Sequence, residues 1–373
     1  MSRRFRWSVA LGAAALLPLG AFVPVATATA APTAAPTAAP TQSRHTGVEI
    51  PAQAALRDAV TPSECTTTLL DDYVDGLFAD MTDEQFAFLV QHQVALLSVP
   101  TYDALFFGTA GDPDYALDSH AAQLSHTYRD LQRFWDIESD DIQLMAMHSD
   151  SLLDATRIAR TLEAMVDTGE LPFMSDAAIA AEAQTVATFM QAQDAAFQDN
   201  PLWTFNAFAF SAEGETDPFI ASLPDKLIIG DGILEAYDGI GLGDVGPRVI
   251  MAHEFAHHVQ YELGTFDSGP SDPAEATRRT ELMADAMASY FATHKKGLAL
   301  NRKRVADALL SFYSVGDCSF ASPGHHGTPL QRERAADWGA DLAAAARPRS
   351  AVLPAATVVE MFDAALPGIV SGS

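Results

Sequence analysis

Residues 253–257 read His-Glu-Phe-Ala-His, inside the unbroken segment 248–263 (RVIMAHEFAHHVQYEL). Pro247 suits the first turn of a helix, because a proline there gives up an N–H that has no helical partner. Gly264 suits the end of a helix, because glycine adopts the left-handed conformation of a C-terminal cap. These signals predict one helix with the five residues near its middle.

The spacing of the two histidines predicts a metal site on this helix. Residues at positions i and i+4 lie on one face, so His253 and His257 can direct their imidazoles at a single ion. Glu254 follows the first histidine and can reach a water on that ion. His258 points about a quarter-turn away from His257, and we expect a structural role for it.

A second helix is expected to supply the remaining ligand. Asp272 is a capping residue, Pro273 suits a first turn, and Glu275 stands three residues after the cap. Further along, Glu281 and Asp285 are again i, i+4. A catalytic zinc ion takes three protein ligands, so we expect Glu281 as the third. We expect Asp285 to accept a hydrogen bond from a ligand histidine and fix its tautomer.

Two alternative interpretations of the motif fit the sequence less well. An amphipathic helix with two exposed histidines leaves the pair Glu281 and Asp285 unexplained. A di-iron bundle needs a second Glu-x-x-His on another helix, and none is found. We therefore expect one Zn²⁺ per chain, although other divalent first-row ions suit the same ligands.

Two phrases carry a resemblance to a known family. HEFAHHVQ (253–260) and ELMADAMASYF (281–291) closely resemble the bacterial neutral zinc metallopeptidase family, of gluzincin type, in which HExxH is followed by ExxxD. Residues 206–209 (NAFA) and 226–230 resemble the strand pair before the zinc helix in the related prenyl-protease and HtpX-like peptidases. Residues 316–317 and 326–332 (HGTPLQR) resemble that group's closing motif. The resemblance covers roughly residues 203–345, without the family's cysteine-containing loop or its relatives' membrane helices.

The resemblance implies a metalloendopeptidase in which Glu254 is the general base for a metal-activated water. It also implies His326 as the donor to the oxyanion of the tetrahedral intermediate, with its neighbour His325 as the alternative. Arg332 would stabilise the oxyanion or hold a structural carboxylate. For all three, a purely structural role stays open.

The expected fold is α+β and mainly helical: a zincin-like metallopeptidase domain with a small antiparallel sheet, preceded by a helical region. Residues 206–210 (NAFAF) and 226–229 (KLII) are the only strands we expect, and either could be the edge along which a peptide extends. The other segments show helical periodicity, with breaks near Pro100, 111–113, 136–141 and 169–172. Thr82 and Gln85 predict a capping box at the start of one such helix. The expected helical segments include 115–135, 142–166, 176–197 and 358–365.

Five parts of the chain follow from composition: a signal peptide (1–30), an Ala/Pro/Thr-rich linker (31–47), a helical region of unknown role (48–199), a metallopeptidase domain (200–347) and a C-terminal tail (348–373). Arginines 3, 4 and 6 precede an apolar stretch that ends in small residues, as in an export signal. We therefore expect a secreted or cell-envelope protein that has no membrane segment after cleavage. Cys65 and Cys318 would then be in an oxidising compartment, and whether they pair stays open.

The charge excludes one class of partner. With 22 Lys+Arg against 49 Asp+Glu, the net charge is −27, which argues against a nucleic-acid ligand. A peptide or protein substrate is expected, of undetermined specificity, and the oligomeric state is not determined. Two other functions remain open, a zinc-dependent amidase or cell-wall hydrolase and a non-catalytic binding protein that retains zinc. An inhibitory role for residues 61–197 is also open.

Overall fold

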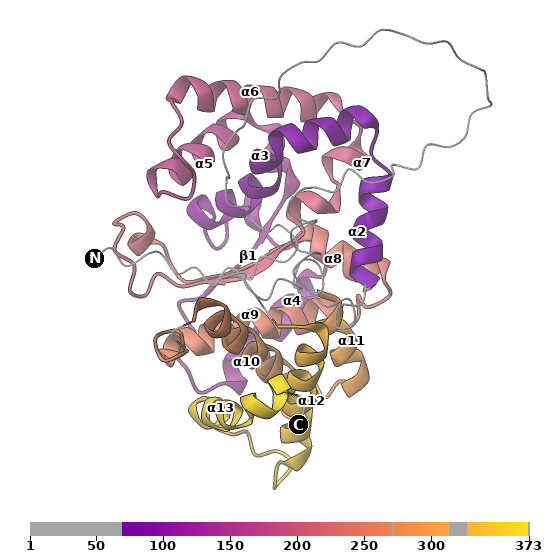
Figure 1. The fold of residues 1–373 in the computed structure, drawn as a ribbon, viewed down its shortest axis with the longest axis vertical. Coiled ribbons are helices and arrows are strands. Elements are labelled where there is room, and N and C mark those ends of the chain that lie inside the picture. Colours follow the sequence, from indigo (N-terminus) through magenta and orange to yellow (C-terminus); the bar gives the residue numbers. More distant parts are fainter. Residues whose placement is uncertain (1–68, 271, 313–326, 372–373) are drawn as a thin grey trace, which may run out of the picture.

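Two groups of helices lie on opposite sides of a small sheet (Figure 1). The computed structural model describes residues 69–270, 272–312 and 327–371. In this part of the chain the longer helices are α2 (Leu69–Ala79), α3 (Asp83–Phe107), α4 (Ala121–Phe134), α5 (Ala155–Asp167), α6 (Asp176–Ala192), α8 (Asp231–Gly239), α9 (Gly246–Glu262), α10 (Pro273–Thr293), α11 (Arg302–Phe312), α12 (Pro329–Ala345) and α13 (Ala355–Ser371). The chain is therefore mainly helical and α+β, as expected.

The sheet is mixed, and its strand order is β1-β3-β2. The strands are β1 (Gln143–Met147), β2 (Ala207–Phe210) and β3 (Lys226–Gly230). β2 pairs antiparallel with β3, with Phe208 opposite Ile228. β1 pairs parallel with β3, with Met145 opposite Ile228. The helices α3 and α9 pack against the sheet, from the upper and lower groups in Figure 1.

The third strand corrects two expectations. Residues 142–147 were expected to begin a helix, and they form β1 instead. The sheet is consequently mixed and not purely antiparallel. It also makes β3 the central strand, so residues 226–229 cannot be an edge for a peptide, whereas β2 is an edge of the three-stranded sheet. β1 comes from the predicted helical region, and it pairs with a strand of the predicted metallopeptidase domain.

The helices follow their local signals in most places. Thr82 forms the expected capping box with Gln85 at the start of α3. Asp272 caps α10 by accepting from the Glu275 amide. Pro100 does not break α3, and the one non-helical residue inside that helix is His92. The helix expected from residue 115 starts at Ala121, after a short 3₁₀ turn.

One continuous apolar core joins the two helix groups. It includes Leu96 and Val99 of α3, Ile228 of β3 and Val249 of α9, all fully buried. The C-terminal segment joins this core as well, because Phe362 of α13 is buried and its ring meets Trp338 edge-on. No helix in the described part of the chain is long and apolar enough to span a membrane.

Candidate metal centre

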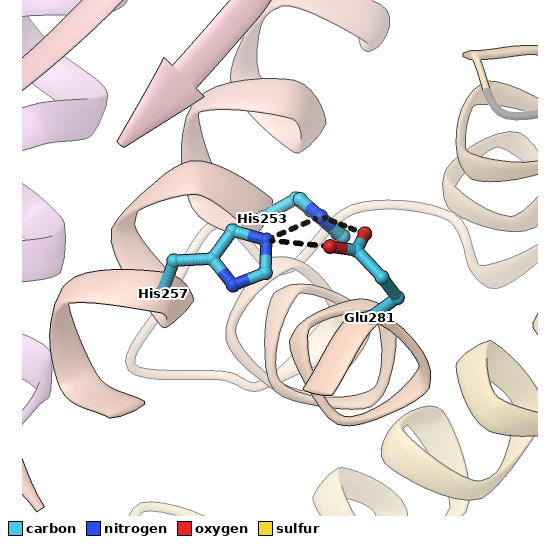
Figure 2. Close-up of side chains that lie close together, drawn as sticks. All are labelled: His253, His257 and Glu281. Carbon is cyan, nitrogen blue, oxygen red and sulfur yellow. Dashed lines mark hydrogen bonds and ion pairs between the residues drawn. The ribbon is translucent and has the colours of Figure 1, made fainter. Parts of the chain in front are cut away.

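Two packed helices, α9 and α10, bring the expected ligands together (Figure 2). Small residues make the close approach feasible, since α10 carries Ala284, Ala286 and Ala288, all fully buried. On the other side of α10, Gly339 of α12 lies so close to the Ala286 carbonyl oxygen that a Cβ there would be 2.0 Å from it. The centre is therefore held between three tightly packed helices.

The two imidazole Nε2 atoms and the two Glu281 carboxylate oxygens lie close together. His253 Nε2 lies 3.1 Å from His257 Nε2 and 3.4 Å from Glu281 Oε2. His257 Nε2 lies 3.5 Å from Glu281 Oε1. A tetrahedral zinc ion with bonds of about 2.0–2.1 Å has ligand atoms about 3.3–3.4 Å apart. The separations are therefore of the size expected between three ligands of one zinc ion.

Hydrogen bonds on the far side of each imidazole fix the histidine tautomers. His253 Nδ1 lies 3.0 Å from Asp285 Oδ1, a carboxylate that can only accept. His257 Nδ1 lies 2.9 Å from Gln260 Oε1. The Gln260 amide nitrogen donates to the Thr280 carbonyl, 2.7 Å away, so its oxygen faces the histidine. Both Nδ1 atoms are therefore donors.

These tautomers favour a proton or a metal ion between the two rings. With both protons on Nδ1, the neutral rings of His253 and His257 direct two Nε2 lone pairs at each other across 3.1 Å, beside the Glu281 carboxylate. Such a set of acceptors is repulsive unless a proton or a metal ion lies among them. All three side chains are buried, so water cannot screen the repulsion.

Arg332 neutralises the carboxylates behind the ligands. Its Nε donates to Asp285 Oδ2 at 2.7 Å, and Nη2 donates to Asp285 Oδ1 at 3.0 Å. Nη2 also lies 3.7 Å from Glu281 Oε2. Arg332 is 1% exposed and Asp285 is fully buried. Of the two roles expected for Arg332, the contacts match the one in which it holds a structural carboxylate.

Glu254 is fully buried and makes no hydrogen bond to another side chain among the described residues. The Ala209 backbone is its hydrogen-bonding neighbour and acts to lower its pKa. Burial raises the pKa of Glu254 to about 8, against the effect of the neighbouring His253, which lowers it. Carboxylates without a side-chain partner are rare in protein interiors, and one next to a metal site suggests a functional role.

The pKa values of the two histidines diverge in the absence of a metal ion. Burial works to lower the pKa of His253, but the hydrogen bonds to Asp285 and Glu281 outweigh it and raise that pKa to about 9. Burial lowers the pKa of His257 to about 4, although the charge of Glu281 opposes the shift. The two imidazoles therefore differ in proton affinity, because His253 faces two carboxylates and His257 faces one.

Some of the other candidate site residues lie in the part of the chain that the structure describes, and others lie outside it. His258 binds the carbonyl of Lys226 through Nε2, at 2.9 Å, and so does not reach the ligand atoms. His148 and His120 pair instead with Asp231 and Asp238. His325, His326, Cys65 and Cys318 lie outside the described residues, as do segments 1–30 and 31–47. Their expected roles remain predictions.

Sequence reasoning missed Gln260 and passed over the side chain of Asn206. Gln260 is three residues after His257, a spacing that places both on one helix face, so the local sequence contained the signal. Asn206 precedes β2 and is 3% exposed, and its amide oxygen and nitrogen have no partner among the described residues.

Comparison with family models, with curated proteins and with solved structures finds no match to this chain.

Proposed function

We propose that this chain is a zinc-dependent metallopeptidase of gluzincin type, with a zincin-like fold, that is exported and hydrolyses peptide bonds. One observation carries the proposal: two histidine Nε2 atoms and the Glu281 carboxylate converge within 3.1–3.5 Å, next to a buried Glu254 that has no side-chain partner in the described structure. The first feature matches a zinc site, and the second matches the base that hydrolysis requires. Export rests on the sequence of residues 1–30 alone.

Zinc is the ion that the ligands favour. Two imidazoles and one carboxylate at this spacing suit Zn²⁺ and leave an open position for a catalytic ion. Bound there, zinc would act as a Lewis acid and lower the pKa of a coordinated water to about 7. Asp285 and Gln260 keep the imidazoles of His253 and His257 in the tautomers that bind a metal.

Glu254 is the residue that we propose moves protons. Its carboxylate lies within electrostatic range of His253 and Glu281 and is not tied to another side chain in the described structure. It can accept a proton from the attacking water and then deliver that proton to the departing amine. Burial raises the pKa of Glu254, whereas a cation held by the neighbouring ligands would favour the carboxylate form that a general base needs.

The edge strand β2 is the proposed contact for the peptide backbone. Among the residues that the structure describes, β2 pairs with β3 on one side only, and the Ala209 backbone lies beside Glu254. An extended peptide that pairs with the other side of β2 would pass the metal centre. The unpartnered amide of Asn206, just before β2, can donate to and accept from such a backbone.

The test compares purified wild-type protein with Glu254→Gln on a mixed peptide library, with zinc content measured on both. Glu262→Gln is the matched control, because it makes the same change on the same helix at an exposed position. We expect zinc in all three proteins and cleavage by the wild type and Glu262→Gln only. Zinc without peptide cleavage by the wild type would favour an amidase, a cell-wall hydrolase or a non-catalytic zinc protein. Absence of zinc from the wild type would refute the proposal.

A further inference from the structure

Arg279 connects three segments next to the metal centre. It lies on α10, two residues before Glu281, and is 5% exposed. Its Nε and Nη2 donate to the two carboxylate oxygens of Asp363 on α13, at 2.7 and 2.8 Å. Its Nη1 donates to the carbonyl of Thr265, 2.9 Å away, in the turn that follows α9. One guanidinium thus joins α10, the end of α9 and the C-terminal helix.

A continuous set of hydrogen bonds leads from this guanidinium to a metal ligand. The Thr265 hydroxyl donates to the backbone carbonyl of Gln260 at 3.1 Å. Gln260 is fully buried, and its side chain binds both the Thr280 carbonyl and His257 Nδ1. The last four carbonyls of a helix have no partner within it, so the end of a helix needs such outside bonds. Thr265 supplies one for the final turn of α9.

The position of Gln260 explains why this end of α9 matters for the centre. Gln260 orients the imidazole of His257, and it lies in the turn of α9 that is most prone to fraying. Arg279, Thr280 and Glu281 are consecutive on α10, so the bonds to Thr265 and Gln260 hold α9 against the turn that carries the third ligand.

We propose that Asp363 is a positioning residue for the metal centre. By fixing the Arg279 guanidinium, it holds Thr265 in place, and Thr265 in turn secures the Gln260 turn and the orientation of His257. The helix α13 then stabilises the arrangement of the metal ligands, although it supplies no ligand. This inference rests on the metal site of the proposed function, and it assigns to the C-terminal segment a role that the sequence did not indicate.

The experiment measures zinc affinity by competition with a chromophoric chelator, so the readout does not depend on catalysis. Replacing groups that orient metal ligands typically weakens binding about 10–100-fold. We expect a loss in that range for Gln260→Ala and, one step further from the metal, a loss of about 3–10-fold for Asp363→Ala. Asp363→Asn, which keeps an acceptor for Arg279, should bind zinc with intermediate affinity and guards against misfolding of the alanine variant.

The matched control is Asp337→Ala. Asp337 on α12 accepts from two nitrogens of Arg302 on α11, and its side chain is 47% exposed against 38% for Asp363. Within the described part of the chain, no hydrogen bond links this pair to a ligand histidine. Its zinc affinity should equal that of the wild type. Far-UV circular dichroism of each variant verifies that the fold is retained.

A double variant tests the route. If Asp363 acts through Gln260, adding Asp363→Ala to Gln260→Ala should cause little further loss of zinc affinity. Additive losses would overturn the route through Gln260. Equal affinities for Asp363→Ala and Asp337→Ala would overturn the positioning role and leave the proposed function intact. A wild-type protein that binds no zinc would overturn the metal site, and this inference with it.

Discussion

Arg332 is a buried cation between two buried carboxylates, so Arg332→Met should strongly destabilise the fold. The guanidinium bonds to Asp285 at 2.7 and 3.0 Å and lies 3.7 Å from Glu281. Methionine keeps much of the volume but removes the charge. Because both members of the Arg332–Asp285 pair are at most 1% exposed, the remaining carboxylate cannot be solvated. Removing one partner of a buried ion pair costs about 3–5 kcal/mol.

The effect of burial can be isolated with Arg302→Met. Arg302 donates to Asp337 through Nε at 2.9 Å and Nη2 at 2.7 Å, so the contacts resemble those of Arg332 with Asp285. Both side chains of this second pair are nearly half exposed. An exposed pair contributes about 0–1 kcal/mol. The two arginine substitutions should therefore differ by about 2–5 kcal/mol in the free energy of unfolding.

Urea unfolding followed by circular dichroism measures this difference. A chelator should be present throughout, because a bound metal would stabilise the variants unequally. Asp285→Asn in the Arg332→Met background removes the unpaired charge and keeps an acceptor for His253, so it should recover part of the stability. Equal losses for Arg332→Met and Arg302→Met would refute the reasoning from burial. Failure of Asp285→Asn to recover stability would assign the loss to packing.

Two further predictions concern stability. Gly339→Ala should destabilise the protein by about 1–3 kcal/mol, because its Cβ would lie 2.0 Å from the Ala286 carbonyl oxygen. Gly76→Ala, on α2, adds a Cβ in open space and should instead stabilise the protein by up to about 1 kcal/mol. Equal melting temperatures for the two variants would contradict this prediction. The hydrogen bond to Asp231 raises the pKa of His148, although burial opposes it. The stabilisation from the His148–Asp231 pair is thus complete below about pH 6.5 and is lost as the pH rises through the pKa of His148 in the folded protein. The unfolding free energies of wild type and His148→Gln should therefore converge as the pH rises from 6 to 8, and a constant difference would argue against the pair.

The sequence predicted local features well because their causes lie within one or two helical turns. The cap at Asp272 and the capping box of Thr82 depend only on nearby backbone amides. The i, i+4 spacing of His253 and His257 places both imidazoles on one face of α9 whatever the helix packs against.

The strand β1 shows where local signals fail. Its sequence, Gln143–Met147 (QLMAM), contains residues that favour helices and none that is β-branched. The segment is extended because it pairs with β3, some eighty residues later in the chain. Such a partner is too distant in sequence to affect local periodicity, so the sheet was expected to have two strands.

The sequence by itself predicted which side chains could hold a metal ion, through helix spacing and the chemistry of His253, His257 and Glu281. Only the tertiary structure decided how those ligands are held. The crossing of α9 and α10 sets the 3.4 and 3.5 Å separations to Glu281. Arg332 pairs with Asp285, and Arg279 pairs with Asp363, because the packing of the helices brings these side chains together. A helix fixes its own faces through short-range geometry, whereas the partner of each face is selected by packing across the whole chain.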